Sequence, residues 1–354
     1  MVLAPFAAPP IRRQWLPIIR QNHLGTDLQL TTPSPPSGLS LVDHDMLAVD
    51  AAIKERLTSG VALVGDVAQY IIAAGGKRLR PKLLLMCCGA LGFEGRQRFN
   101  MAAVVEFIHT ATLLHDDVVD ESTLRRGLPT ANAKFGNPAS VLIGDFLYSR
   151  AFQMMVEVQD MRIMKVLADA TNVIAEGEVM QLMNMHNADL DEKEYLNVIR
   201  SKTSKLFEAS AQVGAILSLA PAKLEAACAE FGQALGTAFQ VIDDVLDYTG
   251  DVTVMGKNLG DDLREGKCTL PLISAMQAGT AQECATIRCA IENGDTGLLD
   301  TVAAIVRRTG ALETSMQSAK KEIQRALGFA NLLPKGPYTD SLIKLATDSV
   351  ERNH

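Results

Sequence analysis

Two copies of one acidic pattern constrain this chain more than any other feature of its sequence. Residues 116–120 read Asp-Asp-Val-Val-Asp, residues 243–247 read Asp-Asp-Val-Leu-Asp, and apolar residues precede each copy. In a helix, the first and last aspartates of each copy are four residues apart and share one face. Like charges at this spacing repel each other and weaken the helix. Because a cation would remove the repulsion, we expect two helices that present carboxylates to bound metal ions.

The apolar setting of both copies favours this interpretation over a solvated acidic helix face, which a single isolated copy would indicate. Paired carboxylates that leave room for water and for phosphate oxygens are typical ligands of Mg²⁺. The sequence therefore predicts magnesium at two carboxylate clusters.

The composition limits the classes of protein to which the chain can belong. Its 354 residues are 47% hydrophobic and 21% charged, and the formal net charge is −7 with no basic tract, which argues against nucleic acid as a partner. Six scattered cysteines lack zinc-ligand spacing and are expected to be reduced thiols of a cytoplasmic protein. No apolar run reaches the roughly 18 residues that a spanning helix needs, so no transmembrane segment is expected.

Residues 1–43 differ from the rest of the chain. They contain Pro-Pro at 9–10 and Thr-Thr-Pro-Ser-Pro-Pro-Ser-Gly at 31–38, and no acidic residue precedes Asp27. This composition predicts a disordered or loosely attached extension. Its arginines resemble those of a transit peptide, but no cleavage pattern follows, so we favour a start codon assigned too far upstream. Residues 44–354 are expected to form one domain.

Helical periodicity dominates from about Val42 onward. Apolar residues recur at three- and four-residue spacing, and strand-like alternation is essentially absent. The periodic segments are 46–57, 61–74, 99–117, 139–158, 161–187, 193–220 and 222–248, followed by shorter ones within 270–352. The sequence predicts an all-α fold, a single large helical bundle in which two long helices present carboxylates inward.

Basic residues accompany both acidic motifs. Arginine side chains and helix N-termini favour phosphate groups, and these residues follow a glycine turn, the first motif, a mid-chain helical stretch and the second motif. They are Lys77, Arg78, Arg80, Arg125, Arg126, Lys202 with Thr203, Lys257 and Lys267. Neither a nucleotide-binding loop nor a nucleophile triad is recognisable. The pattern indicates electrostatic catalysis, in which metals and cations stabilise a departing diphosphate.

Five segments, in order along the chain, resemble the signatures of the trans-polyprenyl diphosphate synthases. They are Gly-Gly-Lys-Arg-Leu-Arg-Pro at 75–81, Leu-Leu-His-Asp-Asp-Val-Val-Asp at 113–120, Arg-Arg-Gly at 125–127, Lys202-Thr203, and Phe-Gln-Val-Ile-Asp-Asp-Val-Leu-Asp at 239–247. The segments 256–262 and 266–272 continue the resemblance, which covers about residues 44–352. Within the family, 106–115 and 174–179 are most similar to bacterial octaprenyl diphosphate synthases.

The resemblance implies a homodimer with an isoprenoid-synthase fold around a deep central cavity. It implies a Mg²⁺-dependent enzyme that adds isopentenyl diphosphate repeatedly to an allylic diphosphate such as farnesyl diphosphate. Two to three magnesium ions would be held by Asp116, Asp120, Asp243 and Asp247, with Asp117, Asp244 and Lys202 supporting catalysis. Isopentenyl diphosphate would bind Lys77, Arg80, His109 and Arg126. The allylic diphosphate would bind Arg125, Lys202, Thr203, Gln240, Lys257 and Lys267.

Helix geometry adds two expectations. His109 lies two turns before Asp116 and therefore faces the same groove; a lone histidine on an apolar helix is more often a core residue, but together with the family resemblance this position favours a diphosphate contact. The small residues Ala111 and Thr112 lie one turn deeper along the path of a growing tail, so they would not block a long product. A bulky floor is then needed further down, and Phe152 is our candidate.

The resemblance also implies an octaprenyl (C40) product that becomes the side chain of a quinone such as ubiquinone, released through a transient membrane contact. Products of C35, C45 or C50 remain alternatives. A terpene cyclase would need no residues for isopentenyl diphosphate. A non-catalytic subunit of a heteromeric synthase typically lacks one aspartate motif, whereas both are intact here.

Overall fold

The structure of the chain is a computed structural model that describes residues 41–73, 75–249 and 260–350. The predicted N-terminal extension lies outside these residues, apart from 41–43, and so does Lys257. The first elements are α1 (Asp43–Arg56), α2 (Ala62–Ala73), α3 (Leu79–Ala90), α4 (Gln97–Val119), β1 (Leu124–Arg125), β2 (Leu128–Pro129), α5 (Ala131–Phe135), α6 (Asn137–Glu157) and α7 (Met161–Met183). They are followed by α8 (Glu192–Ile199), η2 (Arg200–Ser204), α9 (Lys205–Leu217), α10 (Ala222–Thr249), α12 (Asp261–Arg264), α13 (Leu270–Ala278), α14 (Ala281–Asn293), η3 (Thr296–Leu298), α15 (Leu299–Arg308), α16 (Ala311–Ala330) and α17 (Pro337–Val350).

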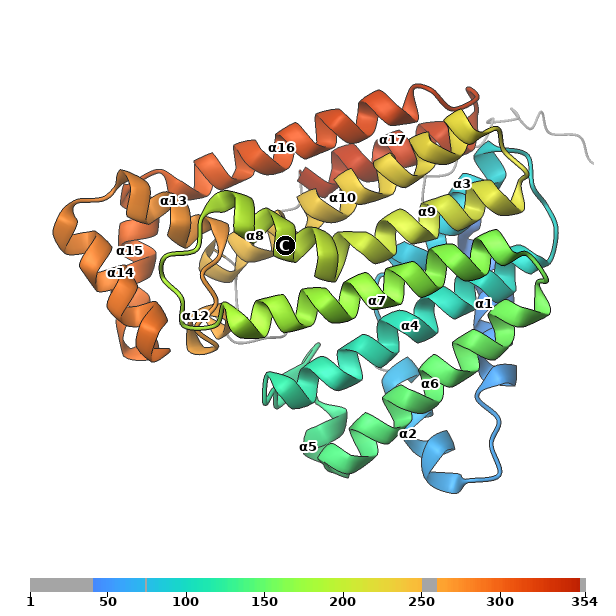
Figure 1. Cartoon of the computed structure of the whole chain (residues 1–354), viewed down its shortest axis with the longest axis horizontal. Coiled ribbons are helices and arrows are strands. Elements are labelled where there is room, and N and C mark those ends of the chain that lie inside the picture. Colours follow the sequence, from blue (N-terminus) through green and yellow to red (C-terminus); the bar gives the residue numbers. More distant parts are fainter. Residues whose placement is uncertain (1–40, 74, 250–259, 351–354) are drawn as a thin grey trace, which may run out of the picture. The chain divides into compact units, whose positions relative to one another are not determined.

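Helix α4 lies in the interior of the bundle. It packs against α1, α3, α6 and α9 (Figure 1). Its successive residues 101–105 are all fully buried, as expected for a helix that neighbours cover on every side. This burial carries the end of α4, with the first acidic motif, into the protein interior.

Helix α10 carries the second acidic motif and packs between α9 and α16. Glycines on α10 permit its close approach to α9. A Cβ added at Gly232 would lie 2.4 Å from the carbonyl oxygen of Phe207, a separation that no side chain tolerates. The two acidic motifs are thus held by long helices whose packing is fixed by their neighbours.

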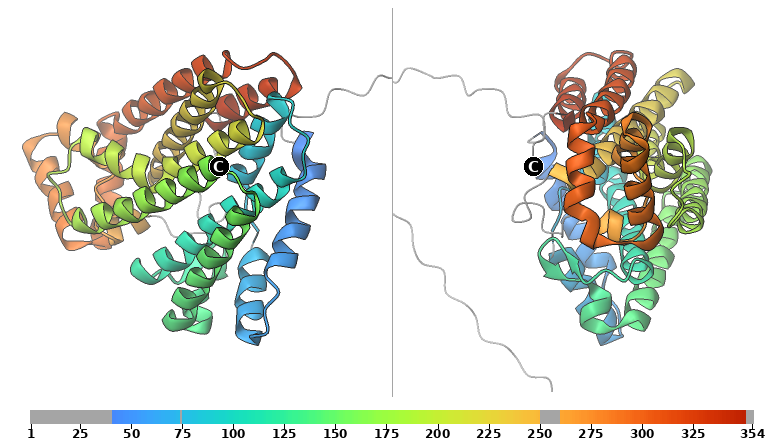
Figure 2. Two further views of the ribbon diagram at one scale, coloured as in Figure 1. Left: turned by 45° about the vertical axis from the view of Figure 1, so that its right-hand side comes forward. Right: turned by 90° about the vertical axis from the view of Figure 1, so that its left-hand side faces the viewer.

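The short helices α13, α14 and α15 pack against one another at one end of α16 (Figure 2). Helix α12 contacts both α10 and α14, and α8 contacts α10 and α13. The turn that bears Lys267 therefore lies between the long helix α10 and this cluster of short helices.

A two-stranded antiparallel hairpin follows the first motif, where the sequence showed no strand pattern. Arg125 pairs with Leu128, which leaves Arg126 and Gly127 as a two-residue loop. Both loop residues have positive φ, +55° and +74°, as type I′ hairpin turns require. The hairpin turns the chain back sharply and places two adjacent arginines beside the motif.

The predicted all-α architecture is confirmed, with one difference inside an expected helix. The segment 193–220 was expected to be continuous, but it contains the π-helical turn η2 between α8 and α9. Among the described residues, no helix combines the length and the apolar character needed to cross a membrane.

Candidate active site

One cavity of about 700 Å³ gathers most of the predicted site residues. Its walls come from α3, α4, the hairpin, α7, α8, η2, α10 and α12, which are far apart in the sequence. The predicted residues that line it are Lys77, Arg80, His109, Thr112, Asp116, Asp120, Arg125, Arg126, Lys202, Thr203, Gln240, Asp243, Asp244 and Lys267. The cavity thus brings both acidic motifs and both groups of cations to one place.

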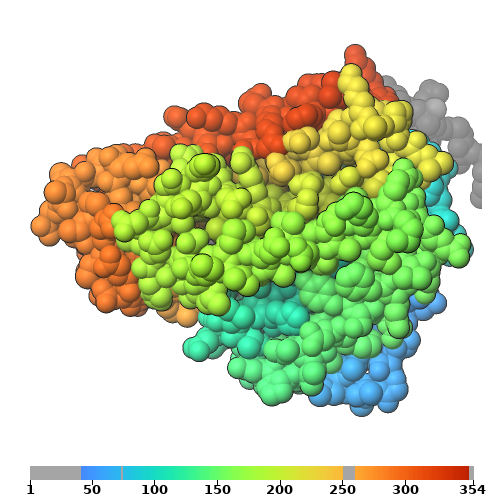
Figure 3. All heavy atoms as spheres, viewed as in Figure 1, coloured from blue at the N-terminus to red at the C-terminus, as the bar shows by residue number. Residues whose placement is uncertain are grey.

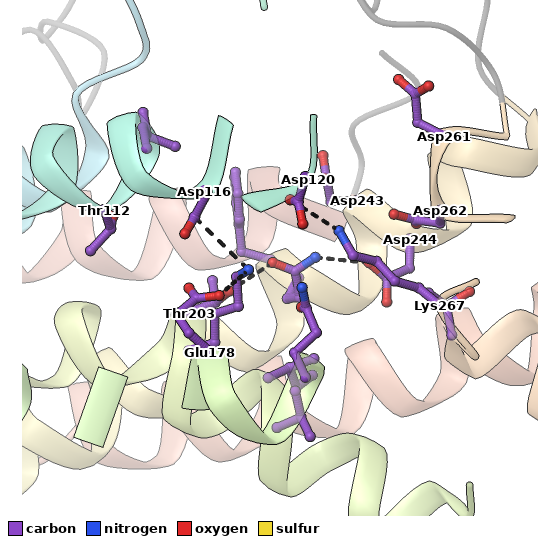
Figure 4. Close-up of a pocket in the computed structure, with 18 of the residues that line it drawn as sticks. Thr112, Asp116, Asp120, Glu178, Thr203, Asp243, Asp244, Asp261, Asp262 and Lys267 are labelled. Carbon is purple, nitrogen blue, oxygen red and sulfur yellow. Dashed lines mark hydrogen bonds and ion pairs between the residues drawn. The ribbon is translucent and has the colours of Figure 1, made fainter. Parts of the chain in front are cut away.

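The first motif faces two lysines in the cavity; Figure 4 shows one of them, Lys267, beside Asp120. Lys202 Nζ lies 3.9 Å from Asp116 Oδ2, and Lys267 Nζ lies 3.4 Å from Asp120 Oδ2. Burial raises the pKa of Asp116 to about 7; the negative charges of Glu178 and Asp120 add to the rise, whereas Lys202 opposes it. Because ionisation of this carboxylate is costly, a nearby cation would strongly stabilise its charged form.

Glu178 is a cavity residue to which the sequence analysis assigned no role. It accepts a hydrogen bond of 2.6 Å from Lys202 Nζ. Helix α7 therefore adds a carboxylate opposite Asp116 (Figure 4). In the sequence, Glu178 was marked only by its position within residues 174–179, one of the segments that resemble octaprenyl diphosphate synthases.

Asp117 turns away from the cavity and holds an arginine. Its Oδ1 accepts hydrogen bonds from Arg125 Nε at 2.9 Å and Nη2 at 2.6 Å, and Asp117 is only 4% exposed. Asn132 donates to the Asp117 backbone carbonyl at 3.0 Å. Asp117 therefore fixes the Arg125 side chain, and its predicted supporting role in catalysis stays a prediction.

The aspartates of the second motif have different surroundings. Asp243 and Asp244 line the cavity, whereas Asp247 does not. Asp247 is 1% exposed, and its Oδ2 accepts the backbone N–H of Asp262 at 3.4 Å. Asp247 therefore lies outside the cavity lining and contacts the start of α12, a placement that does not support direct metal binding, and its predicted role as a metal ligand stays a prediction.

A chain of hydrogen bonds links Asp244 on α10 to two other elements, α8 and η2. Tyr195 Oη donates to Asp244 Oδ2 at 2.6 Å, and Gln240 Nε2 donates to Oδ1 at 2.8 Å. Thr203 Oγ1 in turn donates to Gln240 Oε1 at 2.9 Å. Both oxygens of Asp244 are thus engaged, and the network orients two residues predicted to bind the allylic diphosphate.

Sequence reasoning missed Tyr195, although the start of its helix has a recognisable signature. Asp191 accepts the backbone N–H of Glu194 at 2.8 Å, and Glu194 accepts that of Asp191 at 3.3 Å, which is a capping box. Tyr195 follows directly and is buried. The box predicts where α8 begins, but not that its tyrosine reaches α10.

The turn η2 explains how neighbouring residues face the same cavity. Ser204 Oγ donates to the carbonyl of Ile199, five residues earlier, at 3.3 Å, and lies 3.0 Å from Thr237 Oγ1. Lys202 and Thr203 both line the cavity, whereas neighbours on a regular α-helix point about 100° apart. Such π-turns are frequent at functional sites.

The second cationic group surrounds a neutral histidine. Burial, with the charges of Arg80, Arg126 and Arg125, holds the pKa of His109 well below its usual value of 6.5. Arg80 Nη1 lies 3.2 Å from His109 Nε2, and because arginine can only donate, Nε2 accepts. Arg80 also lies 4.4 Å above the ring of Phe207. These contacts fix the guanidinium in the cavity wall.

A glycine and a carboxylate complete this group. The Arg126 guanidinium packs against Gly76, where an added Cβ would lie 2.7 Å from Nη1, and the φ of +146° at this position favours glycine. Glu106 lines the same part of the cavity, and burial raises its pKa although Arg78, Arg80 and Arg126 oppose the rise. The arrangement concentrates positive charge around one internal carboxylate, which suits a polyanionic ligand.

The predicted chain-length residues do not share one environment. Thr112 lines the cavity, and Ala111 is fully buried beside it without lining it. Phe152 lies on α6, is 36% exposed and does not line the cavity. Phe152 is thus partly exposed and outside the cavity lining, so this placement does not support it as the floor, and its role in chain length stays a prediction.

The donors in the cavity fit magnesium. Asp116, Asp120 and Asp243 offer carboxylate oxygens, and further acidic side chains lie around them (Asp261, Asp262, Glu178 and Glu265). In the described part of the chain, no three metal-ligating side chains are already gathered around a common point. The carboxylates that are present suit Mg²⁺, which is usually held by one or two carboxylates and completes its shell with water and phosphate oxygens.

A helical bundle that sets carboxylates against two groups of cations in one cavity defines a class of enzyme that handles diphosphates with divalent metal ions. Comparison with known proteins agrees. Residues 61–307 match the family model described as polyprenyl synthetase. The chain therefore belongs to the polyprenyl synthetase family, as its motifs predicted.

Individual relatives match almost over their whole length. The chain is 49% identical to octaprenyl diphosphate synthase of Escherichia coli (strain K12), over 88% of this chain and 97% of that protein. It is 45% identical to the geranyl-diphosphate-specific all-trans-nonaprenyl-diphosphate synthase of Rhodobacter capsulatus, over 89% and 97%. Its structure is similar to that of a Caulobacter crescentus CB15 polyprenyl synthase complexed with calcium and isoprenyl diphosphate, with a TM-score of 0.87, 40% identity, and coverage of 90% and 97%.

Proposed function

We propose that this chain condenses isopentenyl diphosphate repeatedly onto an allylic diphosphate, with farnesyl diphosphate as primer, to give all-trans octaprenyl diphosphate (C40) for a quinone side chain. The observation that carries the proposal is the single cavity that joins both aspartate motifs to two groups of cations. Membership of the family and the octaprenyl relative, which matches over nearly its full length, support it.

The two groups of cations provide for two diphosphates. Isopentenyl diphosphate would be held by Lys77, Arg80, His109 and Arg126. Its own diphosphate is not a leaving group in this reaction, so it needs no metal ion. Arg125, Lys202, Thr203, Gln240 and Lys267, with Lys257 from outside the described residues, would hold the allylic diphosphate next to the carboxylates. Two or three magnesium ions, held mainly by Asp116, Asp120 and Asp243, would neutralise that diphosphate when bound.

The residues of the cavity then divide the work of the reaction. Arg125, Lys202 and Lys267 stabilise the charge that develops on the allylic diphosphate as its carbon–oxygen bond breaks. The double bond of isopentenyl diphosphate attacks the allylic cation, and the departing diphosphate takes the proton that is lost. An apolar part of the wall is formed by Phe207, Phe239 and Leu246. It excludes water and strengthens the electrostatic attraction between the cations and the departing diphosphate.

The proposed product length rests on the octaprenyl relative and on the small residues Ala111 and Thr112 before the first motif. A nonaprenyl synthase at 45% identity keeps C45 as an alternative, along with C35 and C50. A non-catalytic subunit is disfavoured because Asp116, Asp120 and Asp243 all face the cavity.

We further propose a homodimer in the cytoplasm that touches a membrane transiently to release its lipid product. Helices α6 and α7 lie on the face shown in Figure 3, and both leave large apolar side chains exposed. These are Leu142, Val156, Met161, Val179, Leu182 and Met183. Exposed apolar side chains mark an interaction surface where they lie together, and we propose that these residues do. Sedimentation at several protein concentrations would distinguish a dimer from a monomer.

The function is tested by incubating the purified full chain with farnesyl diphosphate, isopentenyl diphosphate and Mg²⁺. Mass spectrometry of the products should show octaprenyl diphosphate as the main end product, and EDTA should abolish it. A different main length would correct the product assignment alone. The absence of any elongated product in a folded preparation would overturn the proposed function.

A further inference from the structure

His186 lies outside the cavity lining and joins three segments of the chain. Its backbone N–H donates to the carbonyl of Gly266 at 2.8 Å, and its Nδ1 lies 3.0 Å from the carbonyl of Ile291 on α14. Because a carbonyl only accepts, Nδ1 must donate, which assigns the ring proton. His186, three residues after the end of α7, thus contacts both the turn at Gly266 and the end of α14.

The imidazole ring also fills the space beside two glycines. A Cβ at Gly266 would lie 2.3 Å from His186 Nδ1, and a Cβ at Gly294 would lie 3.5 Å from Cε1. His186 itself has a φ of +61°, which is uncommon for a residue other than glycine, and such a conformation persists where the surroundings fix it. The packing therefore leaves the Gly266 backbone little freedom to move.

Gly266 directly precedes Lys267, which reaches the first acidic motif. The Lys267 N–H donates to the Asp262 carbonyl at 2.8 Å, and Nζ pairs with Asp120 at 3.4 Å and with Glu265. We propose that His186 is a positioning residue for Lys267, acting through Gly266 from outside the cavity. This inference rests on the proposed role of Lys267 as a contact of the allylic diphosphate.

The test compares two substitutions of His186. His186→Ala removes the ring and its hydrogen bond, so the KM for farnesyl diphosphate should rise by roughly 3- to 10-fold, the equivalent of one hydrogen bond. The KM for isopentenyl diphosphate should stay within about twofold. In His186→Asn, the KM for farnesyl diphosphate should return most of the way to the wild-type value. The Nδ2 of asparagine occupies the position of the histidine Nδ1 along the side chain, and asparagine tolerates positive φ.

Arg288→Ala is the matched control. It breaks the 2.6 Å ion pair between Asp189 and Arg288, which joins the same connection to α14 without touching Gly266. The KM for farnesyl diphosphate should be unchanged in this variant. An equal rise in Arg288→Ala would contradict the proposal, since general loosening of the junction would then explain the effect.

A double-mutant cycle tests whether His186 acts through the lysine. His186→Ala should add little to the effect of Lys267→Gln, because residues that act as one unit are not additive. An undiminished effect in the Lys267→Gln background, or an unchanged KM in His186→Ala, would overturn the proposal. Calorimetric binding of inorganic diphosphate with Mg²⁺ repeats the comparison without turnover, so it tests His186 even if wild type makes no elongated product.

Discussion

The hydroxyl group of Tyr195 donates a 2.6 Å hydrogen bond to Oδ2 of Asp244, and both residues are 4% exposed. This bond joins α8 to the second acidic motif. Gln240 engages the other oxygen of Asp244, so the carboxylate is held from two sides among further acidic groups. The second motif therefore depends on a residue that lies 48 positions before it begins.

Replacing Tyr195 by Phe should weaken binding of the allylic diphosphate. Without the phenol, Asp244 keeps only the hydrogen bond from Gln240 on its own helix, so the motif loses its tie to α8 and the KM for farnesyl diphosphate should rise about 10-fold, as for a buried bond to a charged group. Steady-state kinetics with each substrate varied in turn measure this. Tyr248→Phe removes another buried phenol from the same region and should leave this KM unchanged; equal effects in both variants would argue against a specific role.

Replacing His109 by Gln should change how stability depends on pH. The folded-state pKa of His109 lies well below 6.5, so the native protein takes up fewer protons than the unfolded chain. The stability due to neutral His109 is present above about pH 6.5 and is lost as the pH falls below it, by at most about 1.4 kcal/mol per pH unit.

Glutamine cannot titrate, yet its carbonyl oxygen can accept the hydrogen bond from Arg80. The fall in Tm between pH 7.5 and 5.5 should therefore be smaller in His109→Gln than in the wild type. Identical falls in the two proteins would show that His109 is not held neutral.

Asp116→Ala should abolish Mg²⁺-dependent condensation, with a loss of at least about 1000-fold, because a carboxylate expected to hold the metal is removed. Binding of Mn²⁺ in the presence of inorganic diphosphate, followed by electron paramagnetic resonance, should weaken as well. Asp169→Ala, which changes an exposed aspartate on α7, should leave both unaffected. Full activity in Asp116→Ala would remove the metal assignment.

Ala111→Tyr should shorten the product to about farnesyl or geranylgeranyl length while turnover remains measurable. Ala111 is fully buried beside Thr112, so the larger ring must displace its neighbours and would cost about 1–3 kcal/mol of stability. Product mass spectrometry, together with a Tm to confirm folding, measures the outcome. An unchanged product ladder in a folded variant would show that the tail does not pass Ala111.

The sequence was sufficient to predict the helices, the family and most of the cavity residues, because apolar periodicity and the acidic motifs are local patterns. It could not predict the cross-helix partners. Tyr195 and Glu178 acquire their roles only when α7 and α8 pack beside α4 and α10. The partial exposure of Phe152 depends on which face of α6 the neighbouring helices cover.

Asp247 shows the same limit within a motif. The spacing of residues 243–247 places Asp243 and Asp247 on one helix face. The Asp247 carboxylate nevertheless accepts the backbone N–H of Asp262 and does not line the cavity. The turn η2, within which the Ser204 hydroxyl bonds the carbonyl five residues back, has no signal in the apolar periodicity of 193–220. A pattern in the sequence marks a face of a helix, whereas the rest of the fold decides what that face meets.

The most direct test of the account is the stoichiometry of elongation. Farnesyl diphosphate and isopentenyl diphosphate carrying different isotopes are incubated with the full chain and Mg²⁺, and the label ratio of the end product is measured with the diphosphate released. An octaprenyl product, the product named for the E. coli relative, predicts about five isopentenyl units per primer and one diphosphate per unit. Diphosphate release without incorporation of isopentenyl label, or no reaction of either substrate, would contradict repeated condensation in this cavity.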